Sequence, residues 1–238
     1  MQSEFKNNKK KNIAIVLAGG KGSRMNSDIP KQYMMVKEKP ILYYSLKTFE
    51  DSFVDEIILV VGTGDIEYCK VNIVDKYNFM KISTIVEGGE ERYNSVYNGL
   101  QAIGDNVIGN VFIHDGARPC VDSTILKRNL ECVEQYGTCV TAMPVKDTIK
   151  IVDDNLFAMD TPDRSHLWQI QTPQTFAIAI IKNAYKKFML DVEKCNITDD
   201  AMVVERYGDS GIKLLEGSYS NIKVTTPEDI KIVENIIL

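Results

Sequence analysis

The stretch Ile13-Ala14-Ile15-Val16-Leu17-Ala18-Gly19-Gly20-Lys21-Gly22-Ser23-Arg24-Met25 decides the fold, because an apolar run leads directly into a glycine-rich turn. The run at 13–17 is typical of a strand that is buried on both faces, as in a parallel sheet. Three glycines within four positions let the backbone turn sharply and bring its N–H groups close to a triphosphate. Arg24 and the later Lys31 add positive charge. The stretch predicts a phosphate-binding loop, and an ordinary turn with two solvated cations is the alternative.

This loop matches neither of the two common nucleotide-binding motifs. No Gly-Lys-Ser/Thr follows at the spacing of the Walker sequence, and the glycines do not form Gly-x-Gly-x-x-Gly. A nucleotide-binding site of another kind is therefore indicated.

Composition is that of an ordinary globular protein. The 238 residues are 44% hydrophobic and 26% charged, and no apolar run approaches the roughly 20 residues of a membrane span. A net charge of −5 gives no general attraction to nucleic acid. The five cysteines are scattered and contain no Cys-x-x-Cys pair, which favours a reducing compartment over a disulfide framework. We expect a cytoplasmic protein that binds neither nucleic acid nor membrane.

Strands and helices alternate along the first half of the chain. Buried-type strands are predicted at 13–17, 56–62, 81–86 and 110–113, with helices from Pro40 to Leu46 and from Glu91 to Ile103. This alternation predicts an α/β fold with a mostly parallel sheet covered on both faces. The loops at 18–31, 88–95 and 115–118 leave strand ends, so they are expected to converge on one crevice.

The remaining segments complete the predicted organisation. Met1–Asn12 is polar and lysine-rich, and is expected to be a disordered tail before a single domain at 13–238. Two β-type segments around Asp153–Asn155 predict a protruding hairpin arm at about 146–166 that packs on another subunit. Further helices are predicted at 177–190 and 199–207, and a last helix has Thr226 as its N-cap and Pro227 at its first position.

The chemistry available to this chain is that of cations. With only His114 and His166, a histidine triad is poorly supported, and no cluster of His or Cys has metal-ligand spacing. The ensemble suits attack on a nucleotide α-phosphorus, where cations stabilise the charge on phosphoryl oxygens. An attacking phosphate is largely dianionic at neutral pH and needs no general base. The residues in question are Arg24, Lys31, Asp115, Arg118, Arg164 and Lys223.

Eight ordered motifs carry a family resemblance. They are Ala18-Gly19-Gly20-x-Gly22-x-Arg24-Met25, Pro30-Lys31-Gln32-Tyr33, Gly88-Gly89-Glu90-Glu91-Arg92-x-x-Ser95-Val96, His114-Asp115-Gly116-Ala117-Arg118-Pro119, Asp147-Thr148-x-Lys150, Gln171-Thr172-Pro173-Gln174, Thr198-Asp199-Asp200 and Asn221-Ile222-Lys223-Val224-Thr225. Together they resemble the 2-C-methyl-D-erythritol 4-phosphate cytidylyltransferase family over nearly everything after the tail. The resemblance implies a Rossmann-like nucleotidyltransferase core that joins CTP to methylerythritol 4-phosphate and releases pyrophosphate with the help of Mg²⁺ or another divalent cation. It also implies a homodimer whose β-arms cross.

The resemblance assigns expected roles by position. Arg24 and Lys31 are the expected catalytic residues, and Asp115 is expected to meet ribose or Mg²⁺. Expected CTP-binding residues are Ala18, Gly19, Gly20, Gly22, Gly88, Gly89, Glu90, Ser95, Asp115 and Gly116. Expected sugar-phosphate-binding residues are Thr148 and Arg164 from the partner's arm, with Thr172, Lys223 and Thr225.

Several positions also have an ordinary structural interpretation. Gly88-Gly89 is also a simple turn, Asp115 a helix cap, and Arg164 and Lys223 solvated surface charges. Arg118 is expected to hold the loop rather than touch substrate. The family usually has alanine where this chain has Gly116, and the missing methyl is expected to loosen the backbone there without a clash.

Two alternative functions stay open at this point. The Gly19 variant of the first loop is shared with related ribitol-5-phosphate cytidylyltransferases, although the motifs at 114–119 and 147–150 lie nearer the methylerythritol pattern. A catalytically silent nucleotide-binding protein is the alternative from another class. Its signature would be the loss of Arg24, Lys31 or Lys223, and all three are present.

Overall fold

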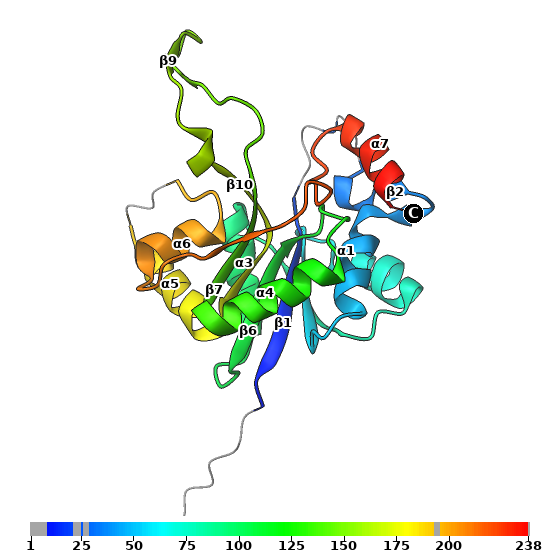
Figure 1. Ribbon diagram of the computed structural model, residues 1–238. Helices are drawn as coiled ribbons and strands as arrows, with labels where there is room; N and C mark the ends of the chain where they lie inside the picture. The colour runs from blue at the N-terminus through cyan, green and yellow to red at the C-terminus, as the bar shows by residue number, and fades with distance from the viewer. Residues whose placement is uncertain (1–8, 21–24, 26–28, 193–195, 238) are drawn as a thin grey trace, which may run out of the picture.

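The computed structural model describes residues 9–20, 25, 29–192 and 196–237. A central sheet runs through it (Figure 1). In sheet order its strands are β11 (Leu214–Glu216), β7 (Thr138–Pro144), β10 (Trp168–Ala177), β6 (Gly109–Asp115), β1 (Lys11–Ala18), β4 (Glu56–Val61) and β5 (Ile82–Glu87). Strand β10 is antiparallel to β6 and β7, and the other neighbouring pairs are parallel. The predicted mostly parallel α/β fold is confirmed.

Strand β1 lies between β6 and β4 and is buried on both faces, as its apolar run predicts. Ile13 and Ile15 pack into one hydrophobic cluster, while Ala14 and Val16 pack into a second cluster on the opposite face. The strand begins at Lys11, so the last two residues of the expected tail belong to the sheet. Residues 1–8 of that tail lie outside the described residues.

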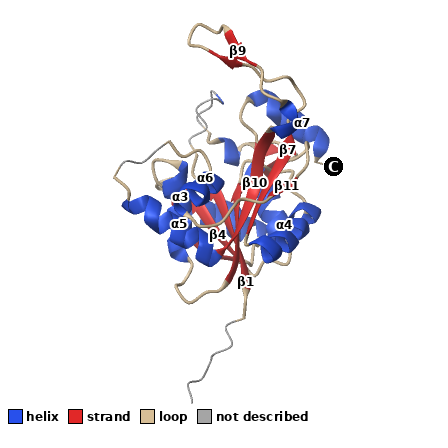
Figure 2. Ribbon diagram, turned by 60° about the vertical axis from the view of Figure 1, so that its left-hand side comes forward, coloured by secondary structure: helices blue, strands red, loops and turns tan. Residues whose placement is uncertain are grey.

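Helices cover both faces of the sheet (Figure 2). One cluster joins the sheet to α3 (Arg92–Ala102), α5 (Ile178–Leu190) and α6 (Asp200–Tyr207). The other joins it to α1 (Ile41–Glu50), α4 (Ser123–Tyr136) and α2 (Ile66–Cys69), which continues into the π-helix η3 (Lys70–Asp75). The sheet is therefore the middle layer of three, because the helices pack on its two faces.

Helix α7 (Pro227–Ile236) closes the described chain next to the short strands β2 (Met35–Val36) and β3 (Lys39–Pro40). Its start matches the prediction, because Thr226 and Asp229 form a reciprocal capping box and Pro227 occupies the first turn. At α1 the prediction is wrong by one residue, since Pro40 is the N-cap rather than the first helical residue.

The predicted arm is present and projects away from the rest of the molecule in both views (Figures 1 and 2). It contains the strand pair β8 (Ile151–Val152) and β9 (Ala158–Asp160), followed by the 3-10 helix η4 (Arg164–His166). Its apolar side chains are open to solvent, with Leu156 82%, Phe157 71% and Met159 69% exposed. These three residues form the arm's apolar surface.

The sheet also positions the loops that the sequence singles out. Parallel pairing puts the carboxyl ends of β1, β4, β5 and β6 at one edge of the sheet. The loops that follow those strands therefore meet at that edge. Within the described ranges, none of the helices has the length and apolar character needed to cross a membrane.

Candidate active site

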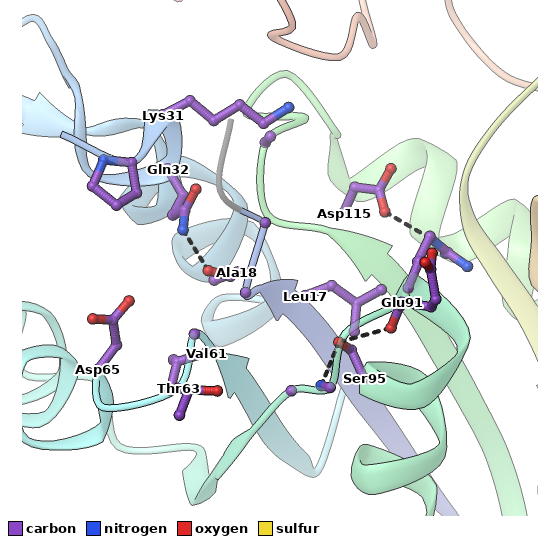
Figure 3. Close-up of a pocket in the computed structure, with 18 of the residues that line it drawn as sticks. Leu17, Ala18, Lys31, Gln32, Val61, Thr63, Asp65, Glu91, Ser95 and Asp115 are labelled. Carbon is purple, nitrogen blue, oxygen red and sulfur yellow. Dashed lines mark hydrogen bonds and ion pairs between the residues drawn. The ribbon is translucent and has the colours of Figure 1, made fainter. Parts of the chain in front are cut away.

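A pocket of about 930 Å³ lies where those loops meet (Figure 3). The prediction that the three loops converge on one crevice is confirmed. In the view of Figure 3, Asp65 and Ser95 lie toward one side of the pocket and Lys31 and Asp115 toward the other. The lining residues are Leu17, Ala18, Gly19, Gly20, Pro30, Lys31, Gln32, Val61, Gly62, Thr63, Asp65, Gly88, Gly89, Glu90, Glu91, Arg92, Ser95, Asp115, Ala117 and Lys223.

Glycines are required where β5 turns into α3. A Cβ atom on Gly88 would lie 2.6 Å from Ser95 Oγ, and one on Gly89 would lie 2.4 Å from Asn94 Cβ. The Ser95 hydroxyl oxygen accepts the Gly89 N–H at 3.1 Å and its O–H faces the Glu91 carbonyl at 3.4 Å (Figure 3). Close packing of the loop on the first turn of α3 thus explains why these positions have no side chain.

The start of the first loop is fixed by the 3-10 helix η2 (Lys31–Tyr33). Buried Gln32 donates from Nε2 to the Ala18 carbonyl at 2.6 Å. Lys31 donates from Nζ to the Val224 carbonyl at 2.9 Å, which ties η2 to the segment before α7. The pocket therefore receives Lys31 from a segment held at both ends. The other expected catalytic residue, Arg24, and the loop residue Gly22 lie outside the described residues.

Asp115, at the end of β6, is surrounded by positive charge. Its Oδ2 is 2.8 Å from Lys223 Nζ and 3.8 Å from Arg118 Nε, and its Oδ1 is 3.4 Å from Arg92 Nε. Burial by itself would raise the pKa of Asp115, but Arg92, Lys223 and Arg118 together hold that pKa well below its usual range. Asp115 is therefore ionised throughout the physiological pH range, and it fixes the Lys223 ammonium beside the pocket.

Arg92 connects Asp115 to a second, fully buried acid. Its NH2 lies 2.8 Å from Asp200 Oδ2, and the Tyr185 hydroxyl donates to Asp200 Oδ1 at 2.6 Å. Burial by itself would lower the pKa of Arg92, but Asp200 and Asp115 raise it above its ordinary value. Arg92 and Asp200 stand in the motifs at 88–96 and 198–200, but no role is predicted for either from the sequence. Their pairing joins positions 108 residues apart, and no local pattern reveals such a contact.

His114 and Thr172 support Asp115 from behind. The Thr172 hydroxyl oxygen accepts the Asp115 N–H at 3.1 Å, so its proton faces His114 Nδ1 at 2.9 Å. His114 Nε2 then carries the ring proton and donates to the Arg118 carbonyl at 3.2 Å. Burial lowers the pKa of His114 to about 4, which keeps the ring neutral. Thr172 is itself buried and its hydroxyl is used inside the protein, away from the pocket lining.

Gly116 is packed more closely than its sequence position suggests. Its N–H donates to the Leu17 carbonyl at 2.8 Å, and a Cβ atom there would lie 2.7 Å from Leu42 Cδ1 and 3.0 Å from Leu17 O. A methyl at this position would have to displace the end of the Leu42 side chain, because α1 packs directly against it. Gly116 is buried and does not line the pocket, whereas the neighbouring Asp115 and Ala117 do.

The predicted sugar-phosphate residues are divided between two places. Lys223 lines the pocket, and Thr225 lies two residues on, where its hydroxyl donates to the Lys223 carbonyl at 3.0 Å. Thr148 and Arg164 lie exposed on the arm, outside the pocket lining of this chain. Arg164 donates from NH1 to the Lys146 carbonyl at 2.8 Å. Arg118 donates to the Asn221 carbonyl at 2.9 Å and so holds the loop, as expected.

In the part of the chain that the structure describes, no three His, Cys, Asp or Glu side chains gather in a way that could hold a metal ion by themselves. Asp115 is the acid at the end of β6 that reaches the pocket, and its Oδ2 already contacts Lys223. Mg²⁺ sites commonly combine one or two carboxylates with substrate phosphates. The donor set fits a metal that arrives with a polyphosphate.

Comparisons with known proteins place the chain in a family. The family model described as 2-C-methyl-D-erythritol 4-phosphate cytidylyltransferase matches residues 12–238. A protein of that name from Lachnospira eligens is 55% identical over 224 residues, 93% of this chain and 96% of its own length, and one from Alkaliphilus oremlandii is 45% identical over 95% of both chains. The crystal structure of 4-diphosphocytidyl-2C-methyl-D-erythritol synthase from Anaerococcus prevotii superimposes with a TM-score of 0.82 at 32% identity, covering 95% of both chains. The Francisella tularensis 2-C-methyl-D-erythritol 4-phosphate cytidylyltransferase superimposes with a TM-score of 0.80 at 30% identity, covering 96% of this chain and all of that one.

Proposed function

The chain belongs to the 2-C-methyl-D-erythritol 4-phosphate cytidylyltransferase family, and we propose that the pocket beyond β1, β4, β5 and β6 is where it transfers a cytidylyl group. The donor is CTP, the acceptor is 2-C-methyl-D-erythritol 4-phosphate, and pyrophosphate leaves. The reaction belongs to non-mevalonate isoprenoid biosynthesis. The observation that carries this placement is Asp115, a carboxylate at the strand ends surrounded by cations that suit phosphate oxygens.

CTP binding is assigned to the loops after β1 and β5. The backbone after Ala18 offers N–H groups without side chains in the way, which suits the triphosphate and ribose. The turn at Gly88 and Gly89 packs closely on Ser95 and borders the same pocket, which suits a flat pyrimidine ring. Glu90 and Ser95 supply the polar groups beside it, and Asp115 is left for the ribose.

The transfer step needs charge stabilisation rather than a proton acceptor. The acceptor phosphate is already dianionic at neutral pH and attacks the α-phosphorus of CTP directly, as the bond to the pyrophosphate oxygen breaks. Negative charge then grows on the phosphoryl oxygens and on pyrophosphate. Lys31 from η2 and Arg24 from the first loop are assigned to that charge, and Lys223 to the acceptor phosphate.

A divalent cation, Mg²⁺, is assigned to the triphosphate, with Asp115 as the protein residue that would reach it. When bound, such an ion neutralises phosphate charge and so makes pyrophosphate a better leaving group. Lys223 shares Oδ2 of Asp115 at 2.8 Å and would give up part of that contact to the ion.

The arm is assigned to dimer formation. The arm's apolar surface, Leu156, Phe157 and Met159, is more than two-thirds exposed, which is costly for a thin hairpin in water. A second copy of the chain would cover it. Thr148 and Arg164 would then reach the partner's pocket, and Thr225 would close the sugar-phosphate side from within each chain, while Thr172 supports Asp115 from behind. A cytoplasmic location is assigned on the scattered cysteines, of which Cys69, Cys120, Cys132 and Cys139 are free thiols.

A paired assay tests the proposal. The purified chain with CTP and Mg²⁺ is given methylerythritol 4-phosphate in one series and ribitol 5-phosphate in another, and pyrophosphate release and product mass are followed. We expect turnover with the methylerythritol substrate. Turnover with ribitol 5-phosphate alone would overturn the substrate, and tight CTP binding in a calorimeter with no product from either would favour the silent nucleotide-binding protein.

A further inference from the structure

Arg92 lies between two carboxylates, Asp115 and Asp200, that come from different secondary-structure elements. Asp115 is at the end of β6, Asp200 begins α6, and the guanidinium of Arg92 at the start of α3 contacts both. We propose that Arg92 is a positioning residue for cytidylyl transfer, which Asp200 and Tyr185 hold so that it orients Asp115 and, through it, Lys223. The inference rests on the proposed function and adds a support that the binding roles above do not contain.

The anchor behind Arg92 is rigid and complete. Asp200 is 0% exposed, and its two oxygens are used by different partners, Oδ2 by Arg92 NH2 at 2.8 Å and Oδ1 by the Tyr185 hydroxyl at 2.6 Å. A buried carboxylate is stable only when paired and hydrogen-bonded in this way. Asp200 therefore fixes the plane of the Arg92 guanidinium from the core side.

A different nitrogen of the same guanidinium contacts the acid at the pocket. Arg92 Nε is 3.4 Å from Asp115 Oδ1, while Lys223 Nζ is 2.8 Å from Asp115 Oδ2. A planar guanidinium presents donors in two directions at once, which a lysine ammonium cannot do over the same span. Because each oxygen of Asp115 has a cation of its own, the carboxylate cannot rotate without losing one of them. The Lys223 side chain is 38% exposed and lines the pocket, and its ammonium is thereby held in one place.

Four groups face Asp115 and set its charge. They are Arg92 from α3, Arg118 from the loop after β6, Lys223 from the segment before α7, and neutral His114 on β6 itself. Removing Arg92 takes away the cation next to Oδ1 of Asp115, while Lys223 stays next to Oδ2. The carboxylate is then free to turn out of the position that it holds beside the pocket.

The test uses a double substitution that keeps the interior neutral. Arg92→Gln with Asp200→Asn removes both charges of the buried pair, which avoids leaving one of them unpaired. The matched control is Lys182→Gln with Asp105→Asn, an ion pair at 3.6 Å that also loses one cation and one anion but is not in the pocket lining. Arg92→Lys is the second variant, because it keeps a charge next to Asp200 but cannot span both acids.

Each variant is assayed for kcat and for KM of both substrates, with circular dichroism and thermal melts for folding. We expect kcat of the double variant and of Arg92→Lys to fall about tenfold, as for lost supports of other sites, with KM for CTP changed less. An arginine that only stabilised the fold would lower the melting temperature and leave kcat of the folded protein unchanged.

The outcomes separate the inference from the proposed function. Should a folded double variant or Arg92→Lys keep kcat within twofold of the wild type, or should KM for CTP rise as much as kcat falls, the positioning role is wrong while the transfer reaction stands. A wild type that makes no product from methylerythritol 4-phosphate overturns both. If the double variant melts below the assay temperature, Arg92→Lys alone decides.

Discussion

The floor of the pocket, meaning Asp115 at the end of β6 and the cations around it, differs from the arm in how its side chains are accommodated. Asp115 at the floor is buried, and each of its oxygens is satisfied by a cation of the same chain. On the arm, Leu156 and Phe157 are 82% and 71% exposed, and no part of the described chain covers them. The floor is supported within one chain, whereas the arm is a surface that suits a partner. The two regions therefore call for different tests, substitution of paired charges at the floor and of apolar side chains on the arm.

Charge and apolar area also predict different sensitivities for the two regions. Paired charges at the floor respond to pH and to single substitutions, because each removed partner leaves another unpaired. If a second copy covers the arm's apolar surface, as proposed, activity should also respond to protein concentration. The predictions below run from the largest effect on activity to the smallest.

Removal of the Lys31 ammonium should lower activity more than any other substitution considered below. For Lys31→Ala we expect kcat to fall about 100-fold or more, which corresponds to roughly 3 kcal/mol of lost transition-state stabilisation. The control is Lys127→Ala on the exposed face of α4, which should leave kcat unchanged. Steady-state pyrophosphate release measures both. A Lys31→Ala enzyme within threefold of the wild type would remove this residue from the transfer step.

A charge on the arm should break the partner surface and leave the floor intact. For Phe157→Asp we expect a monomer by light scattering and unchanged CTP affinity by calorimetry. Activity with methylerythritol 4-phosphate should fall at least about tenfold below that of the wild type. The reason is that a carboxylate cannot be buried against a second apolar arm without a large cost. Asp154→Asn in the turn between β8 and β9 is the control and should stay dimeric. A dimeric Phe157→Asp chain with full activity would contradict the role of the arm.

Mixing two damaged chains tests whether the regions form one site. Arg164→Ala damages the arm and Lys31→Ala damages the pocket, so a heterodimer has one site with both residues intact. Random exchange gives half heterodimers, each with one of two sites intact, so activity should recover to about a quarter of the wild type. Native mass spectrometry establishes that heterodimers form. Their presence without recovered activity would show that Arg164 and Lys31 are not combined across the two subunits.

The sequence predicts those parts of the molecule that depend on local chemistry. The apolar run at 13–17 and the glycine turn place β1 and the pocket, and Thr226 with Pro227 places the start of α7. The motifs after Gly88 and His114 lead to the correct pocket wall. Each of these signals depends on residues within a short stretch of sequence, so it can be recognised without knowledge of the tertiary contacts.

The features that the sequence does not predict depend on contacts between distant segments. No element is predicted at α4 or β7: residues of α4 pack in hydrophobic clusters with other elements, and β7 pairs with the antiparallel strand β10. The link from Arg92 to Asp200 spans 108 residues, and Thr172 is directed to His114 rather than to the pocket. At Gly116 the decisive neighbour is Leu42 on α1. Side-chain direction at such positions is set by packing, which one-dimensional patterns do not record.

The two histidines give the finest comparison, because one lies at each region. Buried His114 has a pKa lowered to about 4, whereas His166 is exposed on the arm. In the unfolded chain a histidine binds a proton below about pH 6.5, but folded His114 resists it until about pH 4, so unfolding is favoured as pH falls through that window. At pH 5 this should cost about 2 kcal/mol relative to pH 7. His114→Gln should flatten that part of the pH dependence in urea unfolding, and His166→Gln should leave it as in the wild type. Neither substitution removes a group that is assigned to phosphate, so kcat at pH 8 should change less than for Lys31→Ala or Phe157→Asp. If His166→Gln flattened the curve and His114→Gln did not, the arm rather than the floor would carry the acid sensitivity of the fold.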